Sequence, residues 1–168
     1  EFTTSSSSDY SDVDFSPDGD FIVTGSEDTF VRIWNVTTHI NLRSVATSGT
    51  VTSVSYSPDG MYVAAGIDDD TMHIYYSSNL TSVHGSISVD VGGSDYVNDV
   101  EFSPDSSLVA VSIGRSGNQG TNGQVFLIEA ATGLKIGNGM NPNGEDRFYD
   151  AAFSPNGELI ALAGNGDF

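Results

Sequence analysis

The sequence predicts an all-β protein made of repeated four-stranded antiparallel sheets, and three observations support this. One segment recurs four times, with copies that begin at Val13, Val54, Val100 and Ala151. In each copy a Ser-Pro turn lies between two short runs of mostly apolar residues, which is the pattern of a β-hairpin. The second run of each copy is apolar at consecutive positions, so both faces of that strand must be covered.

The repeated segment predicts a tight turn in each copy. Proline sets φ at the second position of a type I turn, Asp or Asn is tolerated at the third, and Gly is favoured at the fourth. Each turn is therefore expected to join two strands into an antiparallel hairpin. The four turns are predicted at Ser16–Gly19, Ser57–Gly60, Ser103–Ser106 and Ser154–Gly157.

The first two repeats predict four strands each. Polar loops separate the apolar runs, and a turn through residues 26–29 joins the second and third strands of the first repeat. The first repeat is expected to have strands at Asp12–Phe15, Phe21–Gly25, Phe30–Trp34 and Ile40–Thr47. The second is expected to have them at Val51–Tyr56, Tyr62–Gly66, Thr71–Tyr76 and Thr81–Val91.

The spacing of the repeats predicts how the sheets pack. The turn prolines Pro17, Pro58, Pro104 and Pro155 are 41, 46 and 51 residues apart. A sheet that is buried on both faces and recurs at this spacing stacks between copies of itself, as in a radial array of blades. We expect blades at 11–48, 49–93 and 94–142, a partial blade at 143–168, and a polar lead-in or outer strand of a neighbouring blade at 1–10.

The composition limits the classes of molecule that the chain is expected to bind. The chain carries 23 acidic and 5 basic residues, a formal net charge of −18, which would repel nucleic acid phosphates and an anionic membrane surface. No apolar run approaches the roughly 20 residues of a membrane-spanning helix. The absence of cysteine excludes disulfides and thiolate metal sites, and it gives no argument about the redox compartment. We therefore expect protein partners or further copies of the chain, and neither nucleic acid binding nor membrane insertion.

The segment Asp28–Asn35, which reads Asp-Thr-Phe-Val-Arg-Ile-Trp-Asn after a Phe-Ser-Pro-Asp-Gly hairpin, resembles the WD-repeat β-propeller family. That family typically ends its third strand in Trp-Asp after a turn Asp. The second repeat is similar through Asp69–Tyr75, with Tyr in place of Trp, and the third is similar more loosely through residues 122–133. The resemblance extends from Asp12 onward and implies an all-β fold with three complete blades and the first two strands of a fourth.

The resemblance also implies structural roles for four residues. Asp28 and Asp69 are expected to fix turns as hydrogen-bond acceptors, whereas Trp34 and Tyr75 are expected at equivalent packed positions between blades. The family often has a Gly-His pair before the first strand, and the corresponding stretches here contain no His, so the network of His, Asp, Ser/Thr and Trp should be absent or partial. The three histidines lie elsewhere and are predicted to be structural: His39, His73 and His84.

A glycine-rich segment in the third repeat is a candidate contact loop. Residues 114–123 lack the Lys-Ser/Thr of a phosphate loop, and no helix follows them. We expect a long exposed loop that is able to touch a protein partner. Its candidate contact residues are Arg115, Asn118, Gln119 and Asn122.

Asn35 and Asn79 are candidate N-glycosylation sites. Both begin Asn-x-Thr sequons that fall in equivalent loops of successive blades, although a chain this rich in Ser and Thr also forms sequons by chance. Use of these sequons would require the secretory pathway and favour an extracellular location with attached glycans. Without their use, a cytoplasmic location is expected.

Three classes of function remain. The favoured class is a non-enzymatic protein-interaction or scaffold module that presents loops from several blades. The alternative is an extracellular, glycosylated structural protein that assembles through open blade faces into oligomers or filaments. A non-catalytic fragment of a propeller-based enzyme comes third, because no Ser/His/Asp set and no zinc-type His/Glu helix is found. We expect no catalytic residue, cofactor or metal.

The number of blades predicts association. Three and a half blades cannot close the ring that the family usually forms, so an open array would leave an apolar sheet face exposed at each end. Either sequence beyond these 168 residues or other copies would supply the remaining blades. We expect the isolated 168-residue chain not to be a stable monomer.

Overall fold

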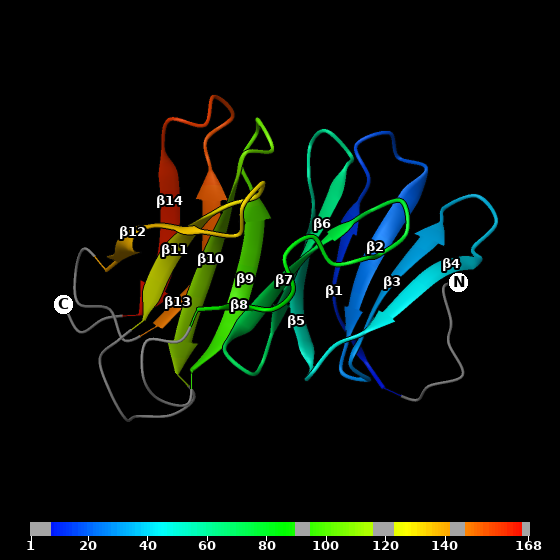
Figure 1. Ribbon diagram of the computed structural model, residues 1–168, viewed down its shortest axis with the longest axis horizontal. Helices are drawn as coiled ribbons and strands as arrows, with labels where there is room; N and C mark the ends of the chain where they lie inside the picture. Colours follow the sequence, from blue (N-terminus) through cyan, green and yellow to red (C-terminus); the bar gives the residue numbers. More distant parts are fainter. Residues whose placement is uncertain (1–7, 90–94, 116–122, 142–146, 166–168) are drawn as a thin grey trace.

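The computed structural model in Figure 1 describes residues 8–89, 95–115, 123–141 and 147–165, apart from the side chains of Asp95 and Arg115. Within these ranges every regular element is a β-strand, and all strand pairs are antiparallel. The described residues contain no helix that is long and apolar enough to cross a membrane. The all-β prediction is therefore confirmed.

The first two repeats form separate four-stranded sheets whose strands pair in chain order. The first sheet consists of β1 (Tyr10–Phe15), β2 (Phe21–Ser26), β3 (Phe30–Asn35) and β4 (Asn41–Ala46). The second consists of β5 (Val51–Tyr56), β6 (Tyr62–Ile67), β7 (Thr71–Tyr76) and β8 (Ile87–Ser88). Each sheet is one blade.

The third repeat forms a blade that touches the beginning of a fourth. The third blade consists of β9 (Asp95–Phe102), β10 (Leu108–Arg115), β11 (Gln124–Glu129) and β12 (Lys135–Met140). The fourth is the hairpin of β13 (Arg147–Phe153) and β14 (Ile160–Asn165). One register pair, Gly114 with Arg147, links β10 to β13. The fold class of three complete blades plus two strands of a fourth is thus confirmed.

The four predicted turns are present and share one geometry. In each of them, the backbone N–H of the fourth residue donates to the carbonyl of the first over 2.8–2.9 Å. The fourth residue has positive φ, which is 75° at Gly19 and 63° at Ser106. Gly is favoured at this position because it adopts positive φ without steric cost, whereas the third turn holds Ser there.

The predicted strand at Thr81–Val91 is wrong in extent. Only Ile87 and Ser88 form strand β8, and Ser82 makes one isolated bridge to Tyr75. Between these two points Gly85 has φ of 76°, and its N–H donates to Ser82 Oγ over 2.8 Å. This local turn replaces the ladder of a continuous strand, and residues 90 and 91 lie outside the described ranges.

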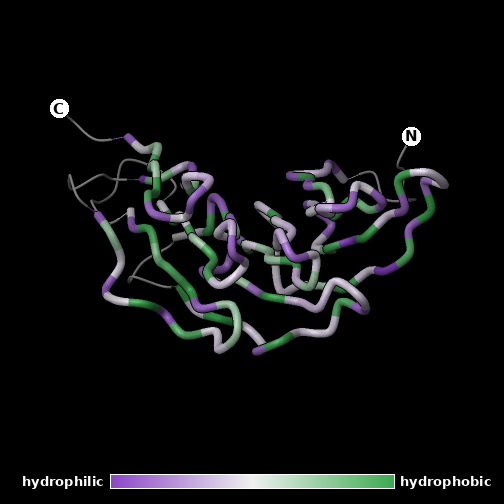
Figure 2. The backbone as a smooth tube through the Cα atoms, turned by 90° about the horizontal axis from the view of Figure 1, so that it is seen from above, coloured by the Kyte–Doolittle hydropathy of each residue, from purple (hydrophilic) through white to green (hydrophobic). Residues whose placement is uncertain are grey.

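The core lies between the blades. Val23, Val31 and Ile33 of the first blade pack in one cluster with residues of the second blade such as Val54 and Val63. A second cluster joins blades two and three, and a third cluster joins blade three to the β13–β14 hairpin. Stacking therefore covers both faces of the central strands. Figure 2 shows the result as a crescent with the two ends of the chain at its opposite tips.

Candidate functional site

The innermost strands of the blades are joined by an upper row of hydrogen bonds that run from one blade to the next. The N–H of Val54 in β5 donates to Asp12 Oδ2 in β1 over 2.9 Å. The N–H of Val100 in β9 donates to Ser53 Oγ over 3.2 Å. The N–H of Ala151 in β13 continues the pattern by donating to a carboxylate of β9 over 3.3 Å. In each case a polar side chain of one blade accepts from the backbone of the following blade.

A lower row lies two residues further along the same strands. The N–H of Tyr56 donates to Asp14 Oδ2 over 2.7 Å, and the N–H of Phe153 donates to Glu101 Oε2 over 3.2 Å. A longer contact of 3.4 Å joins the N–H of Phe102 to Ser55 Oγ. We call the two rows together the inner ladder. Each inner strand is the edge strand of its sheet, so the N–H groups on its free side have no partner within the sheet. The inner ladder gives these N–H groups hydrogen-bond acceptors.

Carboxylates of the inner ladder line an open groove of about 350 Å³ that extends over residues of β1, β5, β9 and β13. Burial raises the pKa of Asp99 to about 6, opposed by the N–H of Ala151 and the hydroxyl of Ser53, and the nearby Asp150 and Asp12 raise it further. Burial is also the main cause of the raised pKa of Glu101. The charge of Asp99 is therefore costly at neutral pH.

The four Ser-Pro turns lie together along one edge of the array, which we call the turn rim (Figure 1). In the third turn Ser103 Oγ donates to Asp105 Oδ1 over 2.6 Å and accepts the N–H of Leu108 over 2.9 Å. The hydrogen bond from Ser103 is the main cause that lowers the pKa of Asp105 to about 2, aided by the backbone and side chain of Ser107. These groups hold the turn rigid, and we assign Asp105 no catalytic role.

The same bonds recur in the other turns. Ser16 and Ser57 each donate to the turn Asp over 2.6 Å, and the fourth turn uses Asn156 Oδ1 as the acceptor for Ser154 Oγ over 2.7 Å. The hydrogen bond from Ser16 also lowers the pKa of Asp18. Because four turns share one network, the rim is a regular surface and not a set of unrelated loops.

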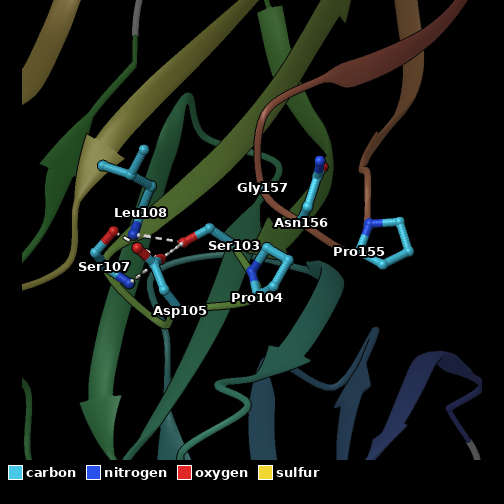
Figure 3. Close-up of a pocket in the computed structure, with 8 residues that line it drawn as sticks. All are labelled: Ser103, Pro104, Asp105, Ser107, Leu108, Pro155, Asn156 and Gly157. Atoms are coloured by element: carbon cyan, nitrogen blue, oxygen red, sulfur yellow. Dashed lines mark hydrogen bonds between the residues drawn. The ribbon is translucent and has the colours of Figure 1, made fainter.

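The turn rim contains two grooves, which are separated by a contact between the second and third turns. Figure 3 shows the larger groove, of about 320 Å³, between the third and fourth turns. Its floor and walls combine apolar groups with a carboxylate and an amide, from Pro104, Leu108, Pro155, Asp105 and Asn156 among others. A smaller groove of about 130 Å³ lies between the first and second turns. The second and third turns are in contact, because the N–H of Asp59 donates to Ser106 Oγ over 3.0 Å.

Asp28 lies in the turn between β2 and β3 of the first blade, and Trp34 lies on β3. Both carboxylate oxygens of Asp28 accept hydrogen bonds from Arg32, over 2.9 and 2.7 Å. Trp34 is buried, its indole N–H donates to Thr24 Oγ1 over 3.0 Å, and Tyr10 meets it edge to face. Their roles as turn acceptor and inter-blade packing residue stay predictions.

Asp69 and Tyr75 occupy the corresponding part of the second blade. Asp69 accepts hydrogen bonds from Ser48 and Thr71, which lower its pKa against the opposing effect of burial. Tyr75 is buried and pairs with Val63, the register position that matches Trp34 with Ile22. His73 stacks on Tyr75 with ring centroids 5.6 Å apart.

The other candidate residues are dispersed. The predicted contact loop of Arg115, Asn118, Gln119 and Asn122 lies outside the described residues, as does the Arg115 side chain. Asn79 is exposed, and its Oδ1 accepts from the N–H and the hydroxyl of Thr81 over 2.9 and 2.7 Å. Asn35 is half-buried at the end of β3 and accepts from Thr38.

The remaining histidines are also separated from one another. His39 is exposed, and His84 contacts the Ala130 carbonyl through Nε2 at 2.9 Å. Among the described residues, no group of three or more His, Asp or Glu is arranged to hold a metal ion.

Two of the repeats match a known family of sequence repeats. The WD40 family profile, described as WD domain, G-beta repeat, matches residues 2–35 and 40–75. These two segments are similar to WD40 repeats. A search of curated proteins finds no significant match. The two matched repeats contain the first two blades up to β7, and the propeller fold extends over the remaining described strands.

Solved structures support the same fold. A chain of the crystal structure of a mitotic checkpoint complex is similar with a TM-score of 0.78 and 21% identity, covering 96% of this chain and 46% of its own length. The structure of U3-55K is similar with a TM-score of 0.71 and 16% identity, covering 86% of this chain and 42% of its own. This chain thus spans less than half the length of each. The match of 1201 solved chains shows a widespread fold that does not by itself select a function.

The inner ladder and the three grooves were not predicted from the sequence. Asp12, Ser53 and Asp99 are equivalent positions of successive repeats, and Asp14, Ser55 and Glu101 are another such set. The recurrence of a short acceptor side chain before each inner apolar residue was visible in the sequence. The hydrogen bonds of these side chains could not be predicted from the recurrence alone, because each partner is a backbone N–H 42 to 52 residues away on the next inner strand.

Proposed function

We propose that this WD40 chain is a protein-interaction module that binds a partner along the turn rim. The observation that supports this most directly is the groove between the third and fourth turns, which combines apolar walls with the polar groups of Asp105 and Asn156. Its turns are held by internal hydrogen bonds, so a partner would not have to order them on binding. The WD40 fold agrees with a scaffold role, and the solved relative in a mitotic checkpoint complex belongs to a protein assembly.

The rim groove is suited to recognition of an extended peptide segment. Proline rings and Leu108 offer apolar contact, while the carboxylate and the amide fix orientation. A segment with an apolar residue next to a basic one fits this chemistry. The serine hydroxyls that donate to Asp105 in this groove belong to the turn network, and a pKa lowered to about 2 makes the Asp105 carboxylate a weak base.

The proposal is tested by comparing two variants in quantitative affinity purification, followed by calorimetry with the purified partner. Asn156→Arg places a long cation in the groove, and Ser86→Arg places the same side chain at an exposed position that does not line the groove. We expect Asn156→Arg to weaken binding of the partner at least tenfold, and Ser86→Arg to leave it unchanged. Equal binding by both variants would contradict the assignment to this groove.

The exposed sequon at Asn79 supports a second candidate, a glycosylated extracellular protein. Its side chain stands on the surface, and Thr81 lies within hydrogen-bond distance of the acceptor amide. Enzymatic deglycosylation of the chain secreted from eukaryotic cells would show a mass loss if this candidate holds. An unchanged mass would remove its support.

A further inference from the structure

Two Asn-Gly pairs lie within the described residues, and the structure gives them different surroundings. Asn138-Gly139 is on β12, the outer edge strand of the third blade, and Asn156-Gly157 is in the fourth Ser-Pro turn. Both asparagines are exposed. An Asn side-chain amide is open to attack by the next backbone nitrogen when Gly follows, because Gly has no side chain to hinder the approach. The two pairs therefore show how the fold controls one reaction at two places in one chain.

Asn138 lies in a β-bulge of β12. Residues 137–139 stand opposite the single residue Phe126 of β11, and a bulge leaves its extra residues without partners in the ladder. The glycines on both sides of Asn138 have positive φ, 74° and 43°, so the backbone here departs from extended strand geometry. In the part of the chain that the structure describes, the Asn138 side chain has no hydrogen-bond partner. Its amide is therefore free to turn toward the backbone nitrogen of Gly139.

Packing requires glycine after Asn138. A Cβ atom at Gly139 would overlap Gln124 Oε1 and would lie 2.8 Å from Phe126 Cε1, closer than Cβ atoms approach other heavy atoms. The positive φ of Gly139 adds strain for any other residue. The fold therefore requires, next to Asn138, the residue type that leaves its amide open to attack.

Hydrogen bonds hold the other pair in place. Asn156 Oδ1 accepts from Ser154 Oγ over 2.7 Å and from the N–H of Glu158 over 3.2 Å, and Asn156 Nδ2 donates to Glu158 Oε2 over 2.8 Å. The backbone N–H of Gly157, which carries the attacking nitrogen, donates to the Ser154 carbonyl over 2.8 Å. Attack would break this bond and pull the amide out of its contacts. The reaction at Asn156 therefore needs the turn to open first.

We propose that Asn138 is a site of spontaneous deamidation and that the fourth turn protects Asn156 from the same reaction. The backbone nitrogen of Gly139 loses its proton to hydroxide and attacks Cγ of Asn138. A C–N bond forms, and the side-chain nitrogen takes up a proton from water and leaves as ammonia. Water then opens the cyclic imide at either carbonyl, which gives an aspartyl or an isoaspartyl residue. The net reaction consumes one water and releases one ammonia.

The modification changes the charge and the backbone of one edge strand. Each event adds a carboxylate to a chain whose formal net charge is already −18. The isoaspartyl product also lengthens the main chain of β12 by one carbon within the bulge. The modified fraction would increase with the age of the protein. The inference is independent of the function proposed for the turn rim.

Peptide mass spectrometry of the full chain, aged at mildly alkaline pH in water labelled with heavy oxygen, measures the reaction at each asparagine. Fragmentation must locate the label, because the Asn-Gly pairs that begin at Asn122, Asn143 and Asn165 lie wholly or partly outside the described residues. We expect Asn138 to react at least tenfold faster than Asn156 in the folded chain. Comparable rates at these two positions, or a faster reaction at Asn156, would overturn the proposal.

The same chain unfolded in concentrated urea separates the effect of the fold from that of the local sequence. Both pairs should then react at similar rates, because the hydrogen bonds that hold Asn156 are lost. A tenfold difference that persists in urea would assign the difference to the sequence and would also overturn the proposal. Asn138→Gln is the control for the folded chain, since the longer side chain has to close a larger ring. It should lose the label at position 138 and leave the rate at Asn156 unchanged.

Discussion

Asp99→Asn should stabilise the folded chain at neutral pH. Asp99 accepts hydrogen bonds from Ser53 Oγ over 3.1 Å and from the N–H of Ala151 over 3.3 Å. An Asn side chain has the same shape, and its Oδ1 can accept from Ala151 while its amide donates to Ser53. The substitution therefore keeps the inner ladder and removes only the charge.

The magnitude follows from the pKa of this carboxyl. It is raised from 3.8 to about 6, mainly by burial. A pKa that is higher in the folded state stabilises the fold below pH 3.8, and this contribution is lost as the pH rises through 6. A shift of about two units corresponds to about 3 kcal/mol at pH 7 as an upper limit. Because Asp99 retains some contact with water, we expect Asp99→Asn to gain about 1–2 kcal/mol in the free energy of unfolding.

Urea unfolding at fixed protein concentration between pH 4 and pH 7 measures this gain. The stability difference between Asp99→Asn and the unsubstituted chain should be largest at pH 7 and should shrink toward pH 4. Asp68→Asn removes a charge from an exposed turn and serves as the control. A difference that is constant with pH, or a less stable Asp99→Asn at pH 7, would refute the reasoning.

Three further predictions concern single side chains. Trp34→Ala should lower the free energy of unfolding by about 3–5 kcal/mol, since it removes a buried indole and the hydrogen bond to Thr24. A melting curve that does not change would place Trp34 outside the packed interior. Ser103→Ala should cost about 1–3 kcal/mol, because it removes the buried hydroxyl that accepts the N–H of Leu108. Denaturant unfolding measures this cost, and a neutral result would show that the turn network adds no stability. In secretory expression Asn79→Gln should abolish any glycan-dependent mass shift, and persistence of the full shift would assign the glycan elsewhere.

Much of the fold could be predicted because its determinants are local. The geometry of each Ser-Pro turn is determined by four consecutive residues, and all four predicted turns are present. The apolar second strands required cover on both faces, which stacking between blades provides. The strand at Thr81–Val91 was predicted too long because the pattern of apolar residues continues through Gly85, while positive φ at that residue interrupts the ladder.

The candidate site was less predictable because its partners are distant in sequence. Asp12 and Asp99 resemble ordinary surface acids in a chain of this charge, yet both accept a backbone N–H of the following blade. Trp34 was recognised as a packed aromatic, but its hydrogen bond to Thr24 depends on the pairing of β2 with β3. The rim grooves arise from the distance between neighbouring turns, a property of the assembled array.

Amide hydrogen exchange at the inner strands tests the central claim, that neighbouring blades are joined by the inner ladder into one curved array. The N–H groups of Val54 and Tyr56 point away from β6, so only a carboxylate of the first blade protects them. We expect slow exchange at both amides in the unsubstituted chain and clearly faster exchange at Val54 in Asp12→Ala. Exchange at Val54 and Tyr56 as fast as that of exposed loop amides would contradict it.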